Sequence, residues 1–233
     1  MLMVETEFHP KISRNSLSSA AVVIPLLLDL ADIRSVIDFG CKHGEWLHVF
    51  AQHGMPRRFG VDRRDEASLL LIDTTEFEAA DLARPFRLNG PFDLAVCIEV
   101  AEHLPKSAAT TLVTTLTSAA PLVLFSAAVP MQGGHGHLNE QPRAYWDDMF
   151  RTHAFRRLDC LRPLMWRDPR VAWWYRQNLF LYATDQAICA NPRLARAAAT
   201  PAAEDLDLVH IDILNRRRWP TRAREYLRRI LAR

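Results

Sequence analysis

Short apolar runs of strand length alternate with amphipathic stretches over most of the chain. The runs that match buried strands are Ser35–Phe39, Arg58–Val61, Phe77–Ala80, Phe92–Ile98, Leu122–Ser126, Phe155–Cys160 and Leu179–Tyr182. The stretches with helical periodicity are Ser16–Ala31, Glu45–His53, Lys106–Ala119 and Arg143–His153. This alternation predicts an α/β fold, a doubly wound, mostly parallel seven-stranded sheet with helices on both faces. Ligands bind such a sheet at the carboxyl ends of its strands, so functional residues are expected directly after the strands.

The length of the chain suits a single domain with appendages. With 233 residues, of which 49% are hydrophobic, it can bury one sizeable core. We predict a flexible N-terminal arm at 1–15, the main domain at 16–184 and a helical C-terminal extension at 185–233. The apolar run Ala20–Leu28 contains Pro25 and ends at Asp29, so it is too short to span a bilayer. It is interpreted as a buried helix, and not as a signal peptide.

The spacing of the cysteines and the net charge bear on whether the protein holds a metal or disulfides and whether it binds nucleic acid. Cys41, Cys97, Cys160 and Cys189 are widely spaced and form no Cys-x-x-Cys pair. Neither a zinc site nor a disulfide framework is indicated, and a cytoplasmic location is expected. The net charge of +2 gives no global field that favours nucleic acid or an anionic surface.

The C-terminal end is locally basic. From Arg216 to Arg233 the chain has eight arginines and one acid, Glu225, with apolar residues at near-helical spacing. Such a helix could make a weak peripheral contact with a membrane or an acidic partner. Docking of its apolar stripe onto the domain is the interpretation we favour.

The first predicted strand, Ser35–Phe39, runs into the turn Gly40-Cys-Lys-His-Gly44 and then into a helix. Glycine permits positive φ and a close approach of the backbone to a ligand. A tight strand–helix turn without a function has the same pattern. The next strand ends at Asp62, where a carboxylate suits the two hydroxyls of a ribose or simply caps a helix.

Acidic residues also follow the third and fourth predicted strands. Asp81 comes after the third strand, and Glu99-Val-Ala-Glu-His-Leu104 comes after the fourth. With the glycine turn and Asp62, these positions make the sequence resemble the class I S-adenosylmethionine-dependent methyltransferases. The resemblance extends over 16–184 and implies a Rossmann-like methyltransferase fold, S-adenosyl-L-methionine as cofactor and methyl transfer as the reaction. A dinucleotide site would need Gly-x-Gly-x-x-Gly, which 38–45 do not supply.

The resemblance implies a role for nine residues in cofactor binding. They are Asp38, Gly40, Cys41, Gly44, Asp62, Asp81, Leu82, Ile98 and Glu99. Asp38 would orient the glycine loop or meet the cofactor's amino group through water. Asp62 would bind the ribose hydroxyls, and Asp81 would accept from the adenine amino group while the Leu82 amide faces the ring.

The other five residues would lie against the methionine and adenosine parts of the cofactor. Gly40, Cys41 and Gly44 would let the backbone pack against the cofactor, and Ile98 and Glu99 would lie along its methionine part.

Lys42 departs from the family pattern. The family usually has a glycine between Gly40 and Gly44, and a lysine with positive φ at this place costs on the order of 1 kcal/mol. The departure motivates a non-enzymatic hypothesis, in which the chain is a cofactor-binding partner subunit that has lost turnover.

A polar loop follows the fifth predicted strand, where an acceptor would bind. Residues 133–141 read Gly-Gly-His-Gly-His-Leu-Asn-Glu-Gln, and Tyr145-Trp146 follow. This run resembles a group of bacterial methyltransferases, many of them tied to glycan or natural-product pathways. The same group shares the stretch Trp173-Trp-Tyr-Arg-Gln-Asn178 and Leu208-Val-His210. The resemblance implies a small-molecule or saccharide acceptor without fixing which one.

Histidines are the candidate catalytic residues. Methyl transfer to a hydroxyl needs positioning and a base, and histidine suits that task near neutral pH. His137 is the first candidate and His103 the second, although either could instead hold its own loop or turn. Trp166, Trp173 and Trp174 could stack on a sugar or an aromatic acceptor, but aromatic residues near a sheet edge usually belong to the core.

The leading hypothesis is therefore a methyltransferase that acts on a hydroxyl of a small molecule or saccharide in a biosynthetic pathway. A second is a metal-dependent RNA-end 2′-O-methyltransferase. Glu99, Glu102 and His103 lie at i, i+3 and i+4, so a helix could gather them beside a loop histidine. This resembles small-RNA methyltransferases, but the segment also occurs in many metal-free relatives and no broad basic face is evident. We therefore assign no metal ligand from the sequence.

Overall fold

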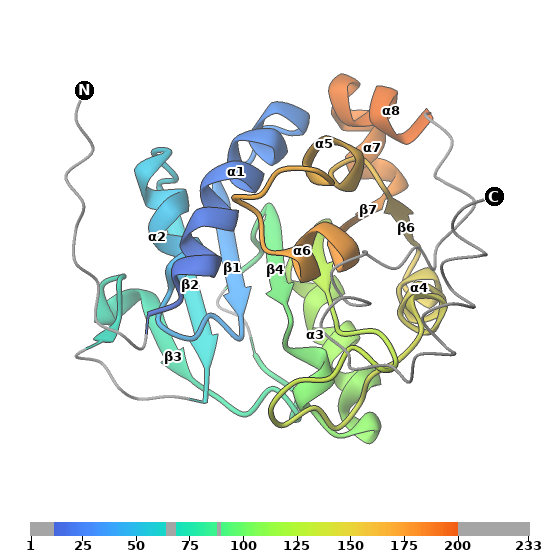
Figure 1. Cartoon of the computed structure of the whole chain (residues 1–233). Helices are drawn as coiled ribbons and strands as arrows, with labels where there is room; N and C mark the ends of the chain where they lie inside the picture. Colours follow the sequence, from blue (N-terminus) through green and yellow to red (C-terminus); the bar gives the residue numbers. More distant parts are fainter. Residues whose placement is uncertain (1–11, 64–68, 88–89, 200–233) are drawn as a thin grey trace.

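The computed structural model describes residues 12–63, 69–87 and 90–199 of the chain (Figure 1). Its sheet has the strand order β3-β2-β1-β4-β5-β7-β6. The strands are β1 (Ser35–Phe39), β2 (Arg57–Asp62), β3 (Phe77–Ala79), β4 (Leu94–Ile98), β5 (Leu122–Ser126), β6 (Phe155–Leu158) and β7 (Phe180–Thr184). Strands β1 to β5 pair in parallel, and β7 is antiparallel to both β5 and β6. The predicted doubly wound, mostly parallel sheet is confirmed.

Helices cover both faces of the sheet (Figure 1). One face packs against α1 (Arg14–Leu30), α2 (Glu45–Gln52), α5 (Arg162–Met165), α6 (Trp173–Asn178), α7 (Asp185–Ala190) and α8 (Pro192–Ala199). The other packs against α3 (Ala109–Ala119) and α4 (Arg143–Thr152). Short 3₁₀ turns are η2 (Thr74–Glu76), η3 (Ala101–His103) and η4 (Lys106–Ala108). Each face of the sheet has its own hydrophobic core, and successive residues of a strand pack into opposite cores. Val36 packs on the α1 side and Ile37 on the α3 side, as the two-residue period of a strand requires.

The start of α1 differs from the prediction. The helix begins at Arg14 because the Ser13 hydroxyl oxygen accepts a hydrogen bond from the Ser16 amide at 3.1 Å and caps it. Ile12 is buried. Residues 12–15 therefore belong to the folded part, contrary to their placement in a flexible arm, and residues 1–11 of that arm lie outside the described part.

The C-terminal extension begins where β7 ends, at Thr184. The Thr184 hydroxyl oxygen caps α7 by accepting from the Ala187 amide at 3.2 Å, and Leu194 of α8 is buried. The basic C-terminal segment and Leu208-Val-His210 lie outside the described residues. None of the helices described is long and apolar enough to cross a membrane.

The chain order reverses between β1 and β4. From β1 the strands run outward to β2 and β3, whereas β4 pairs on the opposite side of β1. The loops after β1 and β4 therefore diverge at the carboxyl edge, and a doubly wound sheet binds its ligand in the crevice between such loops.

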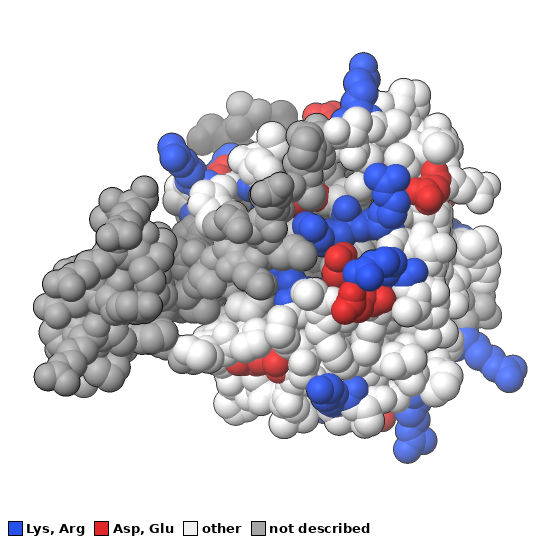
Figure 2. All heavy atoms as spheres, turned by 90° about the vertical axis from the view of Figure 1, so that its right-hand side faces the viewer, with Lys and Arg blue, Asp and Glu red and all other residues white. Residues whose placement is uncertain are grey.

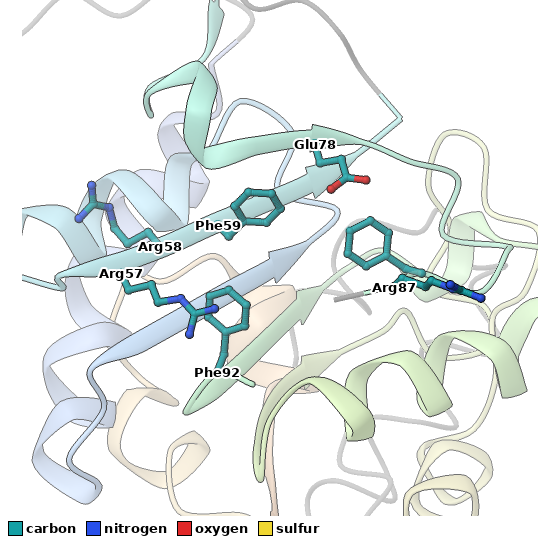
Figure 3. Close-up of a pocket in the computed structure, with 7 residues that line it drawn as sticks. Arg57, Arg58, Phe59, Glu78, Arg87 and Phe92 are labelled. Carbon is teal, nitrogen blue, oxygen red and sulfur yellow. The ribbon is translucent and has the colours of Figure 1, made fainter. Parts of the chain in front are cut away.

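The β3–β4 connection contains no helix in its described residues, which leaves part of the α3-side face uncovered. A cavity of about 200 Å³ lies there, lined by Arg57, Arg58, Phe59, Glu78, Phe86, Arg87 and Phe92 (Figure 3). The Arg57 guanidinium stacks 3.9 Å from the centroid of the Phe92 ring. This cavity is separate from the glycine loop that follows β1.

Candidate active site

A cleft of about 810 Å³ lies at the carboxyl edge of the sheet. Its lining comes from the segments after β1, β2, β3, β4 and β5: Gly40, Lys42, Asp62, Arg63, Leu82, Glu99, Val100, His103, Leu104, His135, Gly136 and Leu138. The cleft thus brings together residues far apart in sequence, as predicted for groups that directly follow parallel strands.

The glycine loop after β1 adopts the conformation that its sequence predicts. Gly40 has φ +87°, and a Cβ atom there would lie 2.3 Å from Val100 Cγ2, so no other residue fits without a shift. Lys42 has φ +56°, which confirms the positive φ expected at the departure from the family pattern. Gly44, at φ +80°, is the N-cap of α2.

Asp62 holds this loop from the end of β2. Its carboxylate accepts hydrogen bonds from the Lys42 amide at 2.8 Å and from the Arg63 amide at 2.6 Å. A carboxylate has about four lone-pair sites, so it can accept further donors from the cleft. Asp62 is partly exposed and lines the cleft, as the ribose role implied by the resemblance requires.

Two buried carboxyl groups lie behind the loop. Asp38 does not line the cleft, and burial, then Asp62 and Glu45, raise its pKa well above the usual value. Glu45 accepts from the Ser13 amide at 2.9 Å and from the His43 amide at 3.2 Å. Glu45 therefore ties the start of α1 to the glycine loop. The sequence shows it only as an acid in the first turn of a helix, and its role was missed.

Three other cofactor candidates differ in exposure. Cys41 is buried, and burial raises the pKa of its thiol, so only its backbone is suited to meet a ligand. Leu82 is buried and lines the cleft. Ile98, the last residue of β4, is half-buried and packs against the α1-side core.

Asp81 is engaged locally. Its carboxylate accepts from the Ala83 amide at 3.0 Å and lies 3.7 Å from the Arg84 guanidinium. It is exposed and does not line the cleft. The contact with adenine implied for Asp81 stays a prediction.

Glu99 is held by amide side chains. Glu99 follows the last residue of β4 and has a left-handed backbone, with φ +53°. Its backbone amide donates to the Ser126 carbonyl oxygen at 3.0 Å and to the Ser126 hydroxyl oxygen at 3.1 Å. Its carboxylate accepts from Gln132 Nε2 at 3.0 Å and from Asn178 Nδ2 at 3.3 Å. Burial raises the pKa of Glu99, while these hydrogen bonds oppose that rise. Its orientation is thus fixed by two other segments.

Asn178 belongs to α6, within the tryptophan-rich stretch. Arg143 donates to Asn178 Oδ1 at 3.2 Å, and Arg162 donates to the Gln177 carbonyl at 2.9 Å while pairing with Asp159 at 2.6 Å. These polar groups are buried, so their hydrogen bonds fix α6 in one position. Two adjacent amide residues in an apolar stretch were the only sequence signal for this network.

The sequence left two roles open for the tryptophans of this stretch, stacking on an acceptor or packing in the core, and they pack in the core. Trp173 is buried and meets Trp174 edge to face at 5.7 Å between ring centroids. Tyr175 packs edge to face on Trp46 at 5.7 Å. None of these rings lines the cleft.

The two candidate histidines are in contact, with ring centroids 4.9 Å apart. His103 is exposed and lines the cleft, whereas His137 does not line it. His103 Nδ1 lies 3.3 Å from the Gly136 carbonyl oxygen. Because a carbonyl can only accept, Nδ1 carries the hydrogen and Nε2 keeps the lone pair. Burial, His137 and His135 lower the pKa of His103, which favours this neutral form.

His137 is held behind His103. Its Nδ1 lies 2.8 Å from Glu140 Oε1, which also accepts from the Gly133 amide at 2.6 Å. A Cβ atom at Gly134 would lie 2.2 Å from His137 Nε2, so the ring packs against bare backbone. The His137–Glu140 pair, three residues apart, was not recognised in the sequence.

Glu102, His103 and His137 form a group in which one possible ligand atom of each lies within 4.8 Å of the others. Burial and then Glu99 raise the pKa of Glu102 to about 9. The helix predicted to gather Glu99 with Glu102 and His103 is wrong. The segment is a single 3₁₀ turn from Ala101 to His103, and Glu99 is not part of the Glu102–His103–His137 group, although its carboxyl group interacts with that of Glu102.

The surface on the β6 and α4 side shows mixed charge (Figure 2). Blue and red side chains lie beside one another among the residues described on that face. Arg151 pairs with Asp148 at 2.5 Å and Arg156 with Asp185 at 3.1 Å. Where the described residues are visible on this face, basic side chains therefore lie next to acidic ones.

Residues 12–168 match the family model of the methyltransferase domain, and the chain belongs to this family. The family-level resemblance is confirmed, while the likeness of the glycine–histidine loop to a glycan-associated group stays a prediction. No curated protein matches the sequence.

Among solved structures the fold is similar to DesVI from Streptomyces venezuelae, with TM-score 0.55, 13% identity, and 74% of this chain and 93% of that chain covered. It is also similar to CalS10 from Micromonospora echinaspora, an amino pentose methyltransferase solved with S-adenosylmethionine, with TM-score 0.54, 14% identity and coverage of 78% and 99%. The small RNA methyltransferase HEN1 has TM-score 0.52 and 15% identity, with 79% of this chain but 27% of that chain covered. At these identities the likeness concerns the fold.

The residues present at the cleft fit S-adenosylmethionine. A backbone loop with positive φ follows β1, an open carboxylate ends β2, an apolar side chain follows β3, and Glu99 follows β4. These groups match the ribose hydroxyls, the flat adenine and the polar methionine part of that cofactor.

Proposed function

We propose that the chain is an S-adenosylmethionine-dependent methyltransferase that methylates a hydroxyl group of a small molecule or saccharide. The observation that carries this is the cleft itself, in which the cofactor residues after β1, β2 and β4 share one space with His103. S-adenosylmethionine, when bound, supplies a methyl group on a sulfonium. Gly40 and Asp62 would hold it, and Glu99 would orient its methionine part.

His103 is the better placed of the two candidate bases. Its Nε2 keeps a lone pair and its ring lines the cleft, so it can take the proton that an acceptor hydroxyl loses. His137 and Glu140 stand behind it, and the ring contact of 4.9 Å limits how His103 can turn. His137 therefore acts through His103 as a positioning residue.

A metal-dependent reaction is the second candidate, and the Glu102–His103–His137 group favours it. Burial and Glu99 raise the pKa of Glu102 to about 9, so binding of a cation by this carboxyl group would release its proton.

The test has two parts. Calorimetric titration with S-adenosylmethionine should show binding by the purified chain, and no binding would overturn the proposal. Incubation with the cofactor and a panel of free sugars, sugar nucleotides and phenols, in the presence of EDTA, should then release S-adenosylhomocysteine with one class and add one methyl mass to the acceptor oxygen.

Chelation separates the two candidates. Under the base mechanism, release of S-adenosylhomocysteine persists in EDTA, and Glu102→Gln retains most of it. If activity instead needs an added divalent cation, and Glu102→Gln, His103→Ala and His137→Ala each lose bound metal by elemental analysis, the metal-dependent candidate replaces the first.

A further inference from the structure

Lys42 occupies a strained backbone position in the wall of the cleft. Its φ is +56°, between the positive-φ glycines 40 and 44, and its side chain is exposed. The hydrogen bond from its amide to Asp62 uses only the backbone, so glycine would make it equally well. Strain at a cleft residue that no local contact explains indicates a role for the side chain.

The acidic and the basic side chains that line the cleft differ in their contacts within the protein. The two carboxylates of the cleft are already engaged: Asp62 by two backbone amides, and Glu99 by Gln132 and Asn178. Lys42 and Arg63 are both exposed and line the same cleft. Asp62 keeps lone pairs for the cofactor, whereas Lys42 and Arg63 are, among the described lining residues, the charged side chains with no hydrogen bond or ion pair inside the protein.

Besides His103 and His135, the segments after β4 and β5 give the cleft an apolar wall. Val100, Leu104 and Leu138 line it, and Leu138 is 70% exposed. An apolar wall and two cations in one cleft suit a ligand that has both a carbon face and a negative charge. An anionic group on the acceptor would give these two cations a partner in the cleft.

We propose that the methyl acceptor is anionic and that Lys42, assisted by Arg63, binds its phosphate or carboxylate group. This rests on the proposed function, because it assigns the substrate class of the same cleft. Charge-assisted hydrogen bonds to such a group are among the stronger polar contacts in proteins, and they fix orientation as well as affinity. The anion would hold the acceptor while its hydroxyl faces His103.

The test measures binding to the full chain saturated with S-adenosylhomocysteine, so that only the acceptor side of the cleft is free. The probes are UDP for a phosphate, glucuronate for a carboxylate and glucose as the neutral comparison, titrated calorimetrically. We expect one anion to bind more tightly than glucose, and which of the two does so identifies the source of the negative charge.

The variants are Lys42→Met, which keeps the side-chain length without the charge, and Lys42→Arg, which keeps the charge. Lys42→Met should weaken the preferred anion by about 5- to 30-fold, while Lys42→Arg retains most of the affinity. Arg34→Gln, which removes an exposed charge at the amino end of β1, is the matched control and should leave anion binding unchanged.

The proposal is overturned if neither anion binds better than glucose, or if the preference survives in Lys42→Met. It is also overturned if Lys42→Met weakens S-adenosylhomocysteine itself, because the lysine would then serve the cofactor's carboxylate. Failure of the wild-type chain to bind the cofactor at all would instead reject the proposed function, so the two failures are distinguishable.

Discussion

The two sides of the cleft are built in different ways. On the cofactor side, after β1 and β2, the geometry comes from backbone: positive φ at Gly40, Lys42 and Gly44, and amides that donate to Asp62. On the acceptor side, after β4 and β5, it comes from side chains that hold one another, as Glu140 holds His137. A backbone loop can be recognised in the sequence from a few adjacent residues. A network of side chains joins residues that are far apart in the sequence, so no local pattern indicates it.

The largest expected effect is on the acceptor side. His103→Ala should lower turnover by about 10²- to 10⁴-fold, because the acceptor hydroxyl loses its base, and cofactor affinity should be unchanged. Steady-state release of S-adenosylhomocysteine and calorimetry measure the two quantities. His53→Ala, at the exposed end of α2, is the control. Full turnover in His103→Ala would show that neither the base nor the metal mechanism uses this ring.

This difference also explains how far the sequence was informative. The sheet, the glycine loop and Asp62 could be predicted because each depends on a local pattern: strand period, glycine spacing and position after a strand. The contact of Asn178 with Glu99 joins residues 79 positions apart, and no local pattern encodes it. The sequence could not show how the two histidines are arranged for the same reason, since only the fold shows that His103 lines the cleft while His137 contacts His103 from outside the lining.

On the cofactor side the expected effect is smaller. Asp62→Ala should weaken S-adenosylmethionine binding by roughly 1–3 kcal/mol, because the ribose hydroxyls lose a charged acceptor and the glycine loop loses the hydrogen bond from the Lys42 amide. Asp62→Asn keeps one acceptor oxygen and should lose less. Asp81→Ala should have less effect still, because Asp81 does not line the cleft. An unchanged affinity in Asp62→Ala would refute the assignment of this side to the cofactor.

Between the two sides lies Glu102, whose buried carboxyl group should make the free energy of unfolding depend on pH. Its pKa is about 9 when folded against an ordinary value of 4.5, so the native state holds a proton that the unfolded chain releases. Its contribution to stability is present below about pH 4.5 and is lost as the pH rises through about 9. Glu102→Gln removes this loss. The free energy of unfolding is measured by urea unfolding in EDTA at pH values across this range. From its lower to its upper end, the difference between Glu102→Gln and the wild type should change by at least about 1 kcal/mol in favour of the variant. Parallel pH profiles would contradict a protonated Glu102.

The smallest expected effect concerns Lys42, where the two sides meet. Lys42→Gly removes a left-handed non-glycine residue but adds freedom to the unfolded chain, so it should change the free energy of unfolding by no more than about 1 kcal/mol, in the stabilising direction. Lys42→Ala is the matched control, because it also removes the charge and keeps the backbone strain, so it should gain no stability. Both variants keep the amide that donates to Asp62 and should bind S-adenosylmethionine as the wild type does. A large loss of cofactor affinity in both would show that the lysine side chain belongs to the cofactor side, and the division between backbone-built and side-chain-built halves would then fail at this residue.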